Sequence, residues 1–328
     1  MRETINRWTE KILQGGNLTE PEALAALSLE GSDLGYFFAG AQHLREKHFG
    51  RKIATCSIIN AKSGLCQEDC AFCAQSVHHQ ANPPVYGLKS VSEIVAGARE
   101  AEGQGCQCFG IVTSGSRIEP GEELEGLLAA LREIRATTNL RPSASLGLLT
   151  STSAAALAKA GCVTYHHNLE TARTFFPQIC TTHAYEQDVE TVRLAKAAGM
   201  KVCCGGIFGL GESLRQRVEL GLTLRELAVD SVPINFLAPV AGTPLGDMRE
   251  LSPMDCLRII ALYRFLLPDK HINVCGGREI NLREFQSWIF LAGASGVMVG
   301  NYLTRQGRDL ETDMQLIRDG ELQLVKQC

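Results

Sequence analysis

The sequence predicts an α/β fold, a (β/α)8 TIM barrel preceded by a helical extension at the N-terminus. Two observations lead to this prediction. Short apolar runs alternate with helix-like stretches from residue 51 onward, and the 328 residues, 45% of them hydrophobic, suffice for one barrel with a large core. An open doubly wound sheet is the competing arrangement of the same alternation. We expect a helical segment over residues 1–50 and a barrel domain over residues 51–328.

The N-terminal segment has the pattern of helices. Thr19-Glu20-Pro21-Glu22 is a typical helix start, because the threonine can cap the helix and the proline stands at an early position. Beyond this segment, runs rich in β-branched and apolar residues predict the eight strands of the barrel. They cover residues 53–59, 106–114, 142–149, 162–170, 201–210, 231–239, 272–277 and 296–300.

The stretches between these runs predict the surrounding helices. They cover residues 91–103, 123–136, 153–161, 185–199, 215–227, 254–266 and 282–293. Several of them end in glycine, which is typical of helix C-termini. In a barrel of this kind the functional groups lie at the C-terminal ends of the strands and in the loops that follow.

Composition narrows the class of protein. The net charge of −4 and the pI of about 6.1 show no basic bias, so neither nucleic acid nor an anionic membrane is an expected partner. No signal peptide or membrane-length apolar run is present, and we expect a cytoplasmic protein. Thirteen cysteines in a reducing compartment point to metal ligation or redox chemistry for a clustered subset. The scattered Cys162, Cys180, Cys256 and Cys328 are expected to be buried apolar residues or surface thiols.

Three cysteines stand close together after the first predicted strand, as Cys66-x3-Cys70-x2-Cys73. Zinc sites usually have four ligands, and His78 and His79 follow the loop, so zinc is one interpretation. Iron–sulfur clusters also use closely spaced thiolates. A cubane held by three cysteines leaves one iron open to a substrate or cofactor, so the spacing favours a site with chemistry.

This spacing, with Phe72 before the last cysteine, resembles the radical S-adenosylmethionine (SAM) superfamily. Longer segments resemble the biotin synthase family within it. They are NAKSGLCQEDCAFCAQS (60–76), YHHNLET (165–171), TTHAYEQ (181–187), VCCGGIFGLGES (202–213), VPINFLAPVAGTPL (232–245) and GGRE (276–279).

The resemblance implies a radical sulfurtransferase that inserts sulfur into dethiobiotin. It implies a 4Fe–4S cluster on Cys66, Cys70 and Cys73, whose open iron binds SAM for reductive cleavage to a 5′-deoxyadenosyl radical. A second, auxiliary iron–sulfur cluster supplies the sulfur. A flavodoxin or ferredoxin electron donor and a homodimer are implied as well.

The resemblance also assigns binding residues around the barrel. It places Asn168 and Glu170 at the ribose hydroxyls of SAM, and Asn168 and Asn235 at dethiobiotin. It assigns the backbone of Gly205, Gly206, Ile207 and Gly209 to packing on adenosine. Each group also has a purely structural interpretation. The asparagines could be core amides with internal hydrogen-bond partners, and the glycines could form a tight strand-to-helix connection.

The chain departs from the family at the auxiliary cluster. The family's three cysteines and one arginine fall on Cys108, Ser143, Cys203 and Asn273, so two ligands are missing. Ser143 and Asn273 are poor ligands for soft metals. His166 and His183 also replace the family's asparagine and arginine, respectively.

Other cysteines stand near the lost ligands. Cys106 and Cys275 lie two residues from Cys108 and Asn273, and residues two apart on a strand share a face. We therefore predict an auxiliary cluster of about four irons on four cysteines, since four thiolates suit a cubane. Its predicted ligands are Cys106, Cys108, Cys203 and Cys275.

Three alternatives stay open. The inner cysteines are core residues of a single-cluster enzyme, the chain is a related radical enzyme for rearrangement or cofactor maturation, or it is a non-catalytic zinc- or iron-binding protein. Cys204 is expected to point outward against a helix, and Cys56 has no predicted role.

Overall fold

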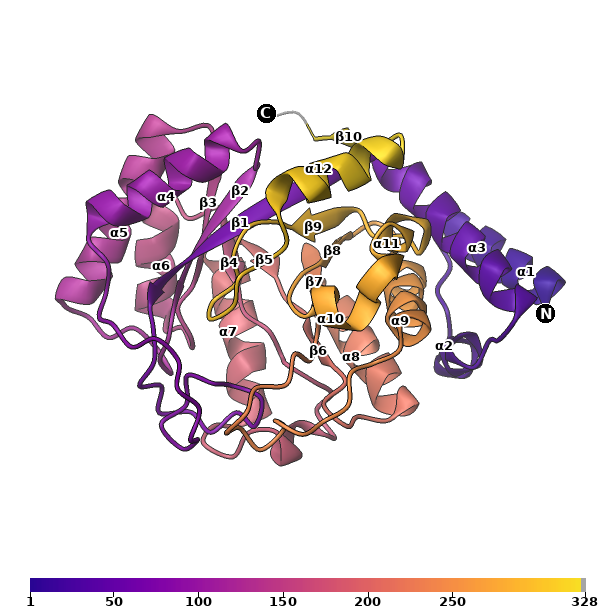
Figure 1. The fold of residues 1–328 in the computed structure, drawn as a ribbon, viewed down its shortest axis with the longest axis horizontal. Helices are drawn as coiled ribbons and strands as arrows, with labels where there is room; N and C mark the ends of the chain where they lie inside the picture. Colours follow the sequence, from indigo (N-terminus) through magenta and orange to yellow (C-terminus); the bar gives the residue numbers. More distant parts are fainter. Residues whose placement is uncertain (326–328) are drawn as a thin grey trace.

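The computed structural model describes residues 1–325, so Cys328 and the last residues of the expected 51–328 domain lie outside the described part. A closed parallel barrel forms the centre of the molecule (Figure 1). Its strands are β1 (Lys52–Lys62), β2 (Cys108–Thr113), β3 (Arg141–Ser145), β4 (Thr164–His166), β5 (Lys201–Cys203), β6 (Gly206–Phe208), β7 (Ser231–Phe236), β8 (His271–Val274) and β9 (Gly296–Met298).

The predicted barrel is confirmed by the pairing of its first and last strands. β1 pairs with β2 on one side and with β9 on the other, which closes the sheet and excludes the open doubly wound arrangement. β5 and β6 both pair with β7 and together fill one position of the barrel. The predicted apolar runs overlap the observed strands, since buried parallel strands need continuous apolar surface, but β1, β3 and β8 begin one residue before their runs and β1 continues to Lys62.

Helices surround the barrel, as the sequence predicts. The main ones are α4 (Val91–Gly103), α5 (Glu122–Thr137), α6 (Ser151–Lys159), α7 (Tyr185–Ala197), α8 (Leu214–Glu226) and α9 (Pro253–Leu266). Capping boxes at Ser90, Thr150 and Ser213 satisfy the first backbone amides of α4, α6 and α8.

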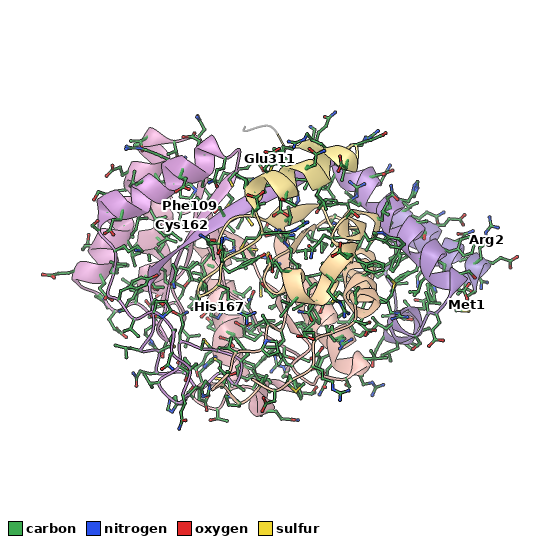
Figure 2. The ribbon with its side chains drawn as sticks, viewed as in Figure 1. Met1, Arg2, Phe109, Cys162, His167 and Glu311 are labelled. Atoms are coloured by element: carbon green, nitrogen blue, oxygen red, sulfur yellow. The ribbon has the colours of Figure 1, made fainter. Side chains whose placement is uncertain are left out.

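The N-terminal segment forms α1 (Arg2–Leu13), α2 (Glu20–Leu27) and α3 (Ser32–Phe49). Thr19 caps α2 in a capping box with Glu22, as expected. The ring of Phe37 on α3 lies 4.9 Å from that of Phe265 on α9, so these helices pack on one side of the barrel. Figure 2 shows Met1 and Arg2 at the far end of this segment and His167 within the barrel. The division into two domains at residue 50 stays a prediction.

The predicted helix over residues 282–293 is wrong in detail. The chain instead forms α10 (Arg278–Leu282), the 3-10 turn η2 (Arg283–Phe285) and α11 (Trp288–Leu291). The break falls at Arg283, which has a positive φ of 49°, and the buried guanidinium of Arg278 donates to Gln286 and Asp313 beyond it. Asp313 belongs to α12 (Leu310–Asp319), which leads to β10 (Gln323–Leu324) beside the start of β1.

No helix in residues 1–325 combines the length and apolar character needed to cross a membrane.

Candidate active site in the barrel

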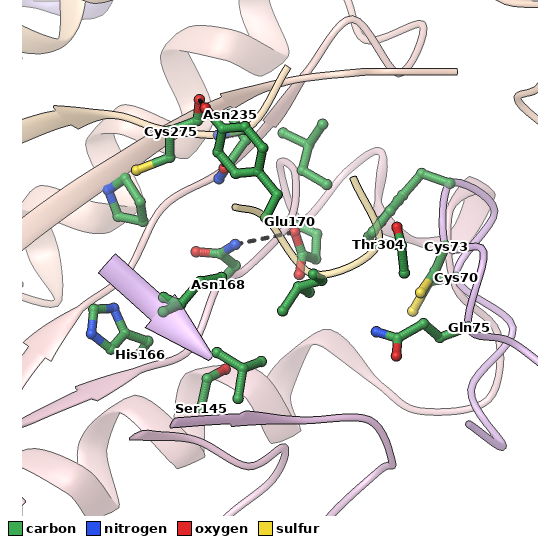
Figure 3. Close-up of a pocket in the computed structure, with 18 of the residues that line it drawn as sticks. Cys70, Cys73, Gln75, Ser145, His166, Asn168, Glu170, Asn235, Cys275 and Thr304 are labelled. Carbon is green, nitrogen blue, oxygen red and sulfur yellow. Dashed lines mark hydrogen bonds between the residues drawn. The ribbon is translucent and has the colours of Figure 1, made fainter. Parts of the chain in front are cut away.

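A cavity of about 580 Å³ occupies the barrel and opens toward the loops after the strands. Residues from each of the strands β1 to β9 line it, together with the loop that carries Cys66, Cys70 and Cys73. Figure 3 shows Cys70 and Cys73 on one side of this space and Cys275 and His166 on the other. The site therefore lies at the end of the barrel where the fold places functional groups.

Backbone hydrogen bonds fold the three-cysteine loop back on itself. The amide of Cys66 donates to the carbonyl of Gln75 over 2.9 Å, and the amide of Cys73 donates to the carbonyl of Cys70 over 2.9 Å. All three thiols line the cavity. The loop thus presents its cysteines to one interior space.

The spacing of these thiols does not suit a single zinc ion. Tetrahedral zinc with bonds of about 2.3 Å to sulfur holds its thiolates only about 4 Å apart. In the described part of the chain, only Glu68, Cys180 and His183 bring three candidate ligand atoms within 4.8 Å of one another. His78 and His79, the candidate zinc partners, instead bond the carbonyls of Gln67 and Cys70. The wider set of thiols fits a cluster of several metal ions.

Cys70 and Cys73 lie where an uncompensated negative charge is costly. A hydrogen bond with Cys180, and then burial, raises the pKa of Cys70. Burial raises the pKa of Cys73 to about 11. Deprotonated thiols here need a cation to stabilise them, which a bound cluster provides.

A polar network beside the loop involves residues whose roles the sequence did not reveal. Nδ1 of His183 donates to Glu68 over 2.7 Å and lies 3.3 Å from the sulfur of Cys180, while Nε2 donates to Asp188 over 3.2 Å. Burial disfavours a charged ring, but the bonds to Asp188, Cys180 and Glu68 outweigh it and raise the pKa of His183 to about 11. His183 is thus a cation, like the arginine that it replaces in the family pattern.

Cys180 is buried, as expected, but it is not a plain core residue. The hydrogen bond from Cys70 is the main reason that its pKa falls to about 5, and His183 adds to the effect. The only sequence signal for this role is the departure at His183, three residues away.

Asn168 and Glu170 both line the cavity. They do not lie on one strand, however, so the strand predicted over residues 162–170 is too long. β4 ends at His166, and Glu170 has a positive φ of 59° beyond it. The amide of Asn168 still donates to the Glu170 carboxylate over 3.5 Å, as Figure 3 shows. Burial, reinforced by the charge of Asp188, raises the pKa of Glu170 to about 8.

The glycines after β5 serve close approach between backbones. A side chain on Gly205 would collide with the carbonyl of Pro233, and one on Gly206 with the carbonyl of Glu170. Gly209 has a positive φ of 93°. Of the four residues assigned to adenosine, Ile207 is the one that lines the cavity.

Asn235 also lines the cavity and is bonded to backbone on both sides. Its amide group donates to the carbonyl of Gly206 over 3.2 Å, and its oxygen accepts from the amide of Gly276 over 2.9 Å. An asparagine side chain offers two donors and two lone pairs, so one of each remains for a ligand. Asn235 is therefore a core amide with internal partners, and it can still bind a ligand in the cavity.

A second group of cysteines lies deeper in the barrel. Cys203 and Cys275 line the cavity, and the thiol of Cys108 contacts the cavity residue Ser143 at 3.4 Å. Cys106 does not line the cavity, because it precedes β2 and is fully buried in the main hydrophobic core. Cys56 on β1, for which the sequence suggested no role, lines the cavity.

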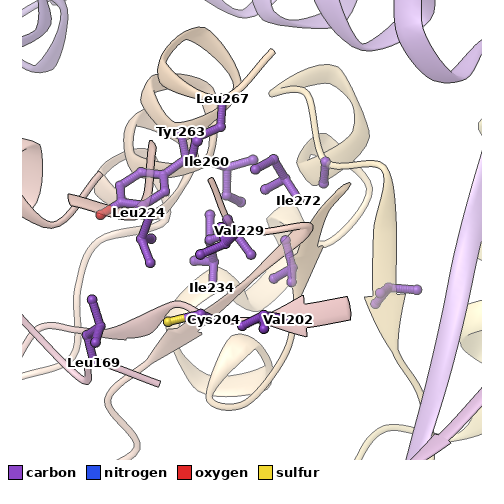
Figure 4. Close-up of a cluster of buried hydrophobic side chains, with 14 of the residues drawn as sticks. Leu169, Val202, Cys204, Leu224, Val229, Ile234, Ile260, Tyr263, Leu267 and Ile272 are labelled. Carbon is purple, nitrogen blue, oxygen red and sulfur yellow. The ribbon is translucent and has the colours of Figure 1, made fainter. Parts of the chain in front are cut away.

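The remaining cysteines of the described chain are core residues. Cys204 packs among apolar side chains outside the barrel wall, as predicted (Figure 4). Cys162 and Cys256 are likewise buried in the main core.

Two regions of the barrel match family models. Residues 62–222 match the Radical SAM superfamily, and residues 233–323 match the Biotin and Thiamin Synthesis associated domain. A biotin synthase from Syntrophotalea carbinolica is 62% identical over 322 residues, which cover 98% of each chain. Another, from Geobacter sulfurreducens, is 58% identical over 97% of this chain and 96% of the relative.

Solved structures share the fold at low identity. The crystal structure of methylornithine synthase superposes with a TM-score of 0.86 at 20% identity over 98% of both chains. A maturase of the FeFe-hydrogenase superposes with a TM-score of 0.83 at 16% identity, over 99% of this chain and 76% of that one. At such identities the likeness concerns the barrel architecture alone.

Proposed function

The chain belongs to the biotin synthase family of radical SAM enzymes, and we propose that it forms biotin by inserting sulfur into dethiobiotin. The observation that carries this proposal is the arrangement of two groups of thiols around one cavity. The outer group lies at its mouth and the inner group lies within the barrel. A substrate between them can meet a radical from one side and sulfur from the other.

Cys66, Cys70 and Cys73 are the proposed ligands of the outer 4Fe–4S cluster. When bound, this cluster supplies the electron that cleaves SAM to the radical that abstracts hydrogen. The donor set fits, because three thiols face one space and are too widely separated for a single ion.

Glu170 and Asn168 are the proposed partners of the SAM ribose. The ionised carboxylate accepts hydrogen bonds from both hydroxyls, and the Asn168 amide holds that carboxylate in place. Ile207 offers an apolar contact for adenine. Gly205, Gly206 and Gly209 act indirectly, by allowing the neighbouring backbones to pack closely.

Asn235 is the proposed partner of the ureido ring of dethiobiotin. Its backbone bonds fix the orientation of the side chain, and its remaining donor and acceptor match the C=O and N–H of that ring. Asn168, across the same cavity, is the second polar group available to the substrate.

The inner thiols are the proposed ligands of the auxiliary cluster, whose sulfide is the source of the inserted sulfur. Ser143 and Asn273 stand where the family has ligands, and neither suits a soft metal. Several thiolates fit an iron–sulfur cluster of about four irons better than the smaller rhombic cluster. A flavodoxin or ferredoxin electron donor, a homodimer and a cytoplasmic location complete the proposal.

Anaerobic turnover with isotopically labelled sulfide tests this function. The holoenzyme is reconstituted with iron and ³⁴S-sulfide and then given dethiobiotin, SAM and a reductant. We expect 5′-deoxyadenosine and biotin that carries the label. Cleavage of SAM without any biotin would instead indicate a rearrangement or maturation enzyme, and the absence of cleavage would indicate a non-catalytic metal protein.

A further inference from the structure

Cys56 lies in the interior of the barrel, on the longest strand. It keeps some accessible surface although it lies within the closed barrel, and it lines the cavity. A thiol with free surface inside a barrel faces space that a ligand can fill. This position raises the question of what Cys56 binds.

Cys56 is close to each of the three inner thiols that remain near the cavity. It is the direct cross-strand partner of Cys108 in the β1–β2 ladder, and such partners point to the same face of the sheet. A side-chain hydrogen bond joins the thiols of Cys56 and Cys275. The sulfurs of Cys56 and Cys108 also lie near that of Cys203.

The sheet register explains how Cys56 and Cys275 meet. Cys56 pairs with Met298 on β9, and Val274 pairs with Val297 one step earlier. Cys275, the next residue after Val274, therefore lies across Met298 from Cys56. The barrel thus brings together thiols that are more than two hundred positions apart in the sequence.

Cys106 lies in a different setting from Cys56. Its side chain has no accessible surface, and it packs with the main hydrophobic core at the end of α4. Its amide donates to the carbonyl of Ala101 over 3.0 Å, which fixes it in the connection before β2. Its sulfur lies near those of Cys56 and Cys108, but it is packed among core side chains, and moving those side chains is costly in a close-packed interior.

His166 provides a separate indication of a polar occupant. Its Nε2 is buried and, within the described chain, has no hydrogen-bond partner, although it lines the cavity beside Cys203. A buried ring nitrogen without a partner is unfavourable unless a ligand satisfies it, and in the tautomer with hydrogen on Nε2 it needs an acceptor. A bridging sulfide of a bound cluster is an acceptor of that kind.

We infer that Cys56, Cys108, Cys203 and Cys275 are the four ligands of the inner iron–sulfur cluster, and that Cys106 is a core residue. This inference rests on the proposed function and replaces one of its four expected ligands. The four sulfurs do not converge within 4.8 Å, so they suit a cluster better than a single ion.

Iron analysis in a background without the outer cluster tests the ligand set directly. Full-length protein carrying C66A, C70A and C73A is reconstituted anaerobically, so that bound iron reports the inner site. We expect about four irons per chain, as for a cubane. Adding C56A should lower this to about three or fewer and change the Mössbauer spectrum, and adding C56A with C275A should remove most of the iron.

C106A in the same background is the matched control. It removes a thiol of equal size from the same region, and we expect iron content and spectrum to stay unchanged. Loss of iron with C106A but not with C56A would overturn the inference and restore Cys106 as the ligand. Unchanged iron with both variants would also overturn it.

Two further measurements separate misfolding and failure of the proposed function from failure of the inference. C56S keeps the size of the side chain and should lose iron as C56A does, with a circular dichroism spectrum like that of the background protein. Labelled biotin from the wild-type holoenzyme tests the function on its own. Biotin formation together with intact iron in both Cys56 variants would refute the ligand assignment alone.

Discussion

The outer loop and the inner barrel both gather cysteine thiols, but by different means. Cys66, Cys70 and Cys73 come from one loop, held by hydrogen bonds over a few residues. Cys56, Cys108, Cys203 and Cys275 come from separate barrel strands or their ends and meet only because the sheet closes. A local site is visible in the sequence, whereas a site built by register is visible only in three dimensions.

The largest expected effect comes from removing an outer thiol. C70A should reduce formation of 5′-deoxyadenosine to the level without protein, because the outer cluster loses one of its three ligands. The measurement is product quantification under anaerobic conditions. C162A, which removes a buried core thiol, is the control and should remain active. Activity in C70A comparable to the control would break the assignment of the outer loop.

Removing an inner thiol should separate the two reactions. C108A should still cleave SAM but form no biotin, because the radical site is intact and the sulfur source is lost. The ratio of biotin to 5′-deoxyadenosine measures this difference. If both products disappear together, the two groups of thiols do not have distinct roles.

A substitution at Asn235 tests whether the substrate binds between the outer and the inner thiols. N235A should raise the KM for dethiobiotin about fivefold or more, since a lost hydrogen bond to a buried group costs about 1–3 kcal/mol. N281A is the control, because within residues 1–325 the Asn281 side chain bonds backbone groups of Leu251, Leu237 and Gly277 and does not line the cavity. Both variants should lower the melting temperature, but only N235A should change the KM.

Glu170 should make SAM binding depend on pH. Its carboxyl is neutral below its pKa of about 8 and ionised above it, so its capacity to accept from the ribose grows as pH rises. The KM for SAM should fall by up to about tenfold between pH 7 and pH 9. In E170Q this dependence should be absent. A wild-type KM that is flat or rises over this range would remove Glu170 from the SAM site.

The smallest expected effect concerns the stability of the outer region. The pKa of His183 rises in the folded state from 6.5 to about 11, so its stabilising effect is complete below pH 6.5 and declines as pH approaches 11. Thermal melts should therefore show that H183Q destabilises the protein more at pH 6 than at pH 9.5. H43Q, at an exposed histidine of α3, is the control and should show no such trend. An equal loss at both pH values would show that His183 is not held as a cation.

The same contrast explains what the sequence could predict. Strand order and the three-cysteine loop follow from local patterns, namely alternation and spacing. The sequence led to Cys106 as the fourth inner ligand, whereas the structure favours Cys56. That choice depends on where β2 begins and on the register between β1, β2 and β9, which the sequence does not reveal. The pairing of Cys180 with Cys70 requires contact between loops more than one hundred residues apart, and no periodicity in the sequence encodes such contacts.

The acidic residues between the outer cysteines have a consequence for assembly. Asp69 accepts from the amides of Thr181 and Thr182 over 2.8 and 3.2 Å, and Glu68 accepts from His183, so the loop after β4 braces the cysteine loop. The cysteine loop is therefore ordered when the protein folds. Binding of iron and sulfide then does not have to offset the conformational entropy of ordering the loop. Under the proposed assignment, the outer site is a preorganised receptor, and its metal affinity is expected to depend on the integrity of a loop that contributes none of the three proposed cluster cysteines.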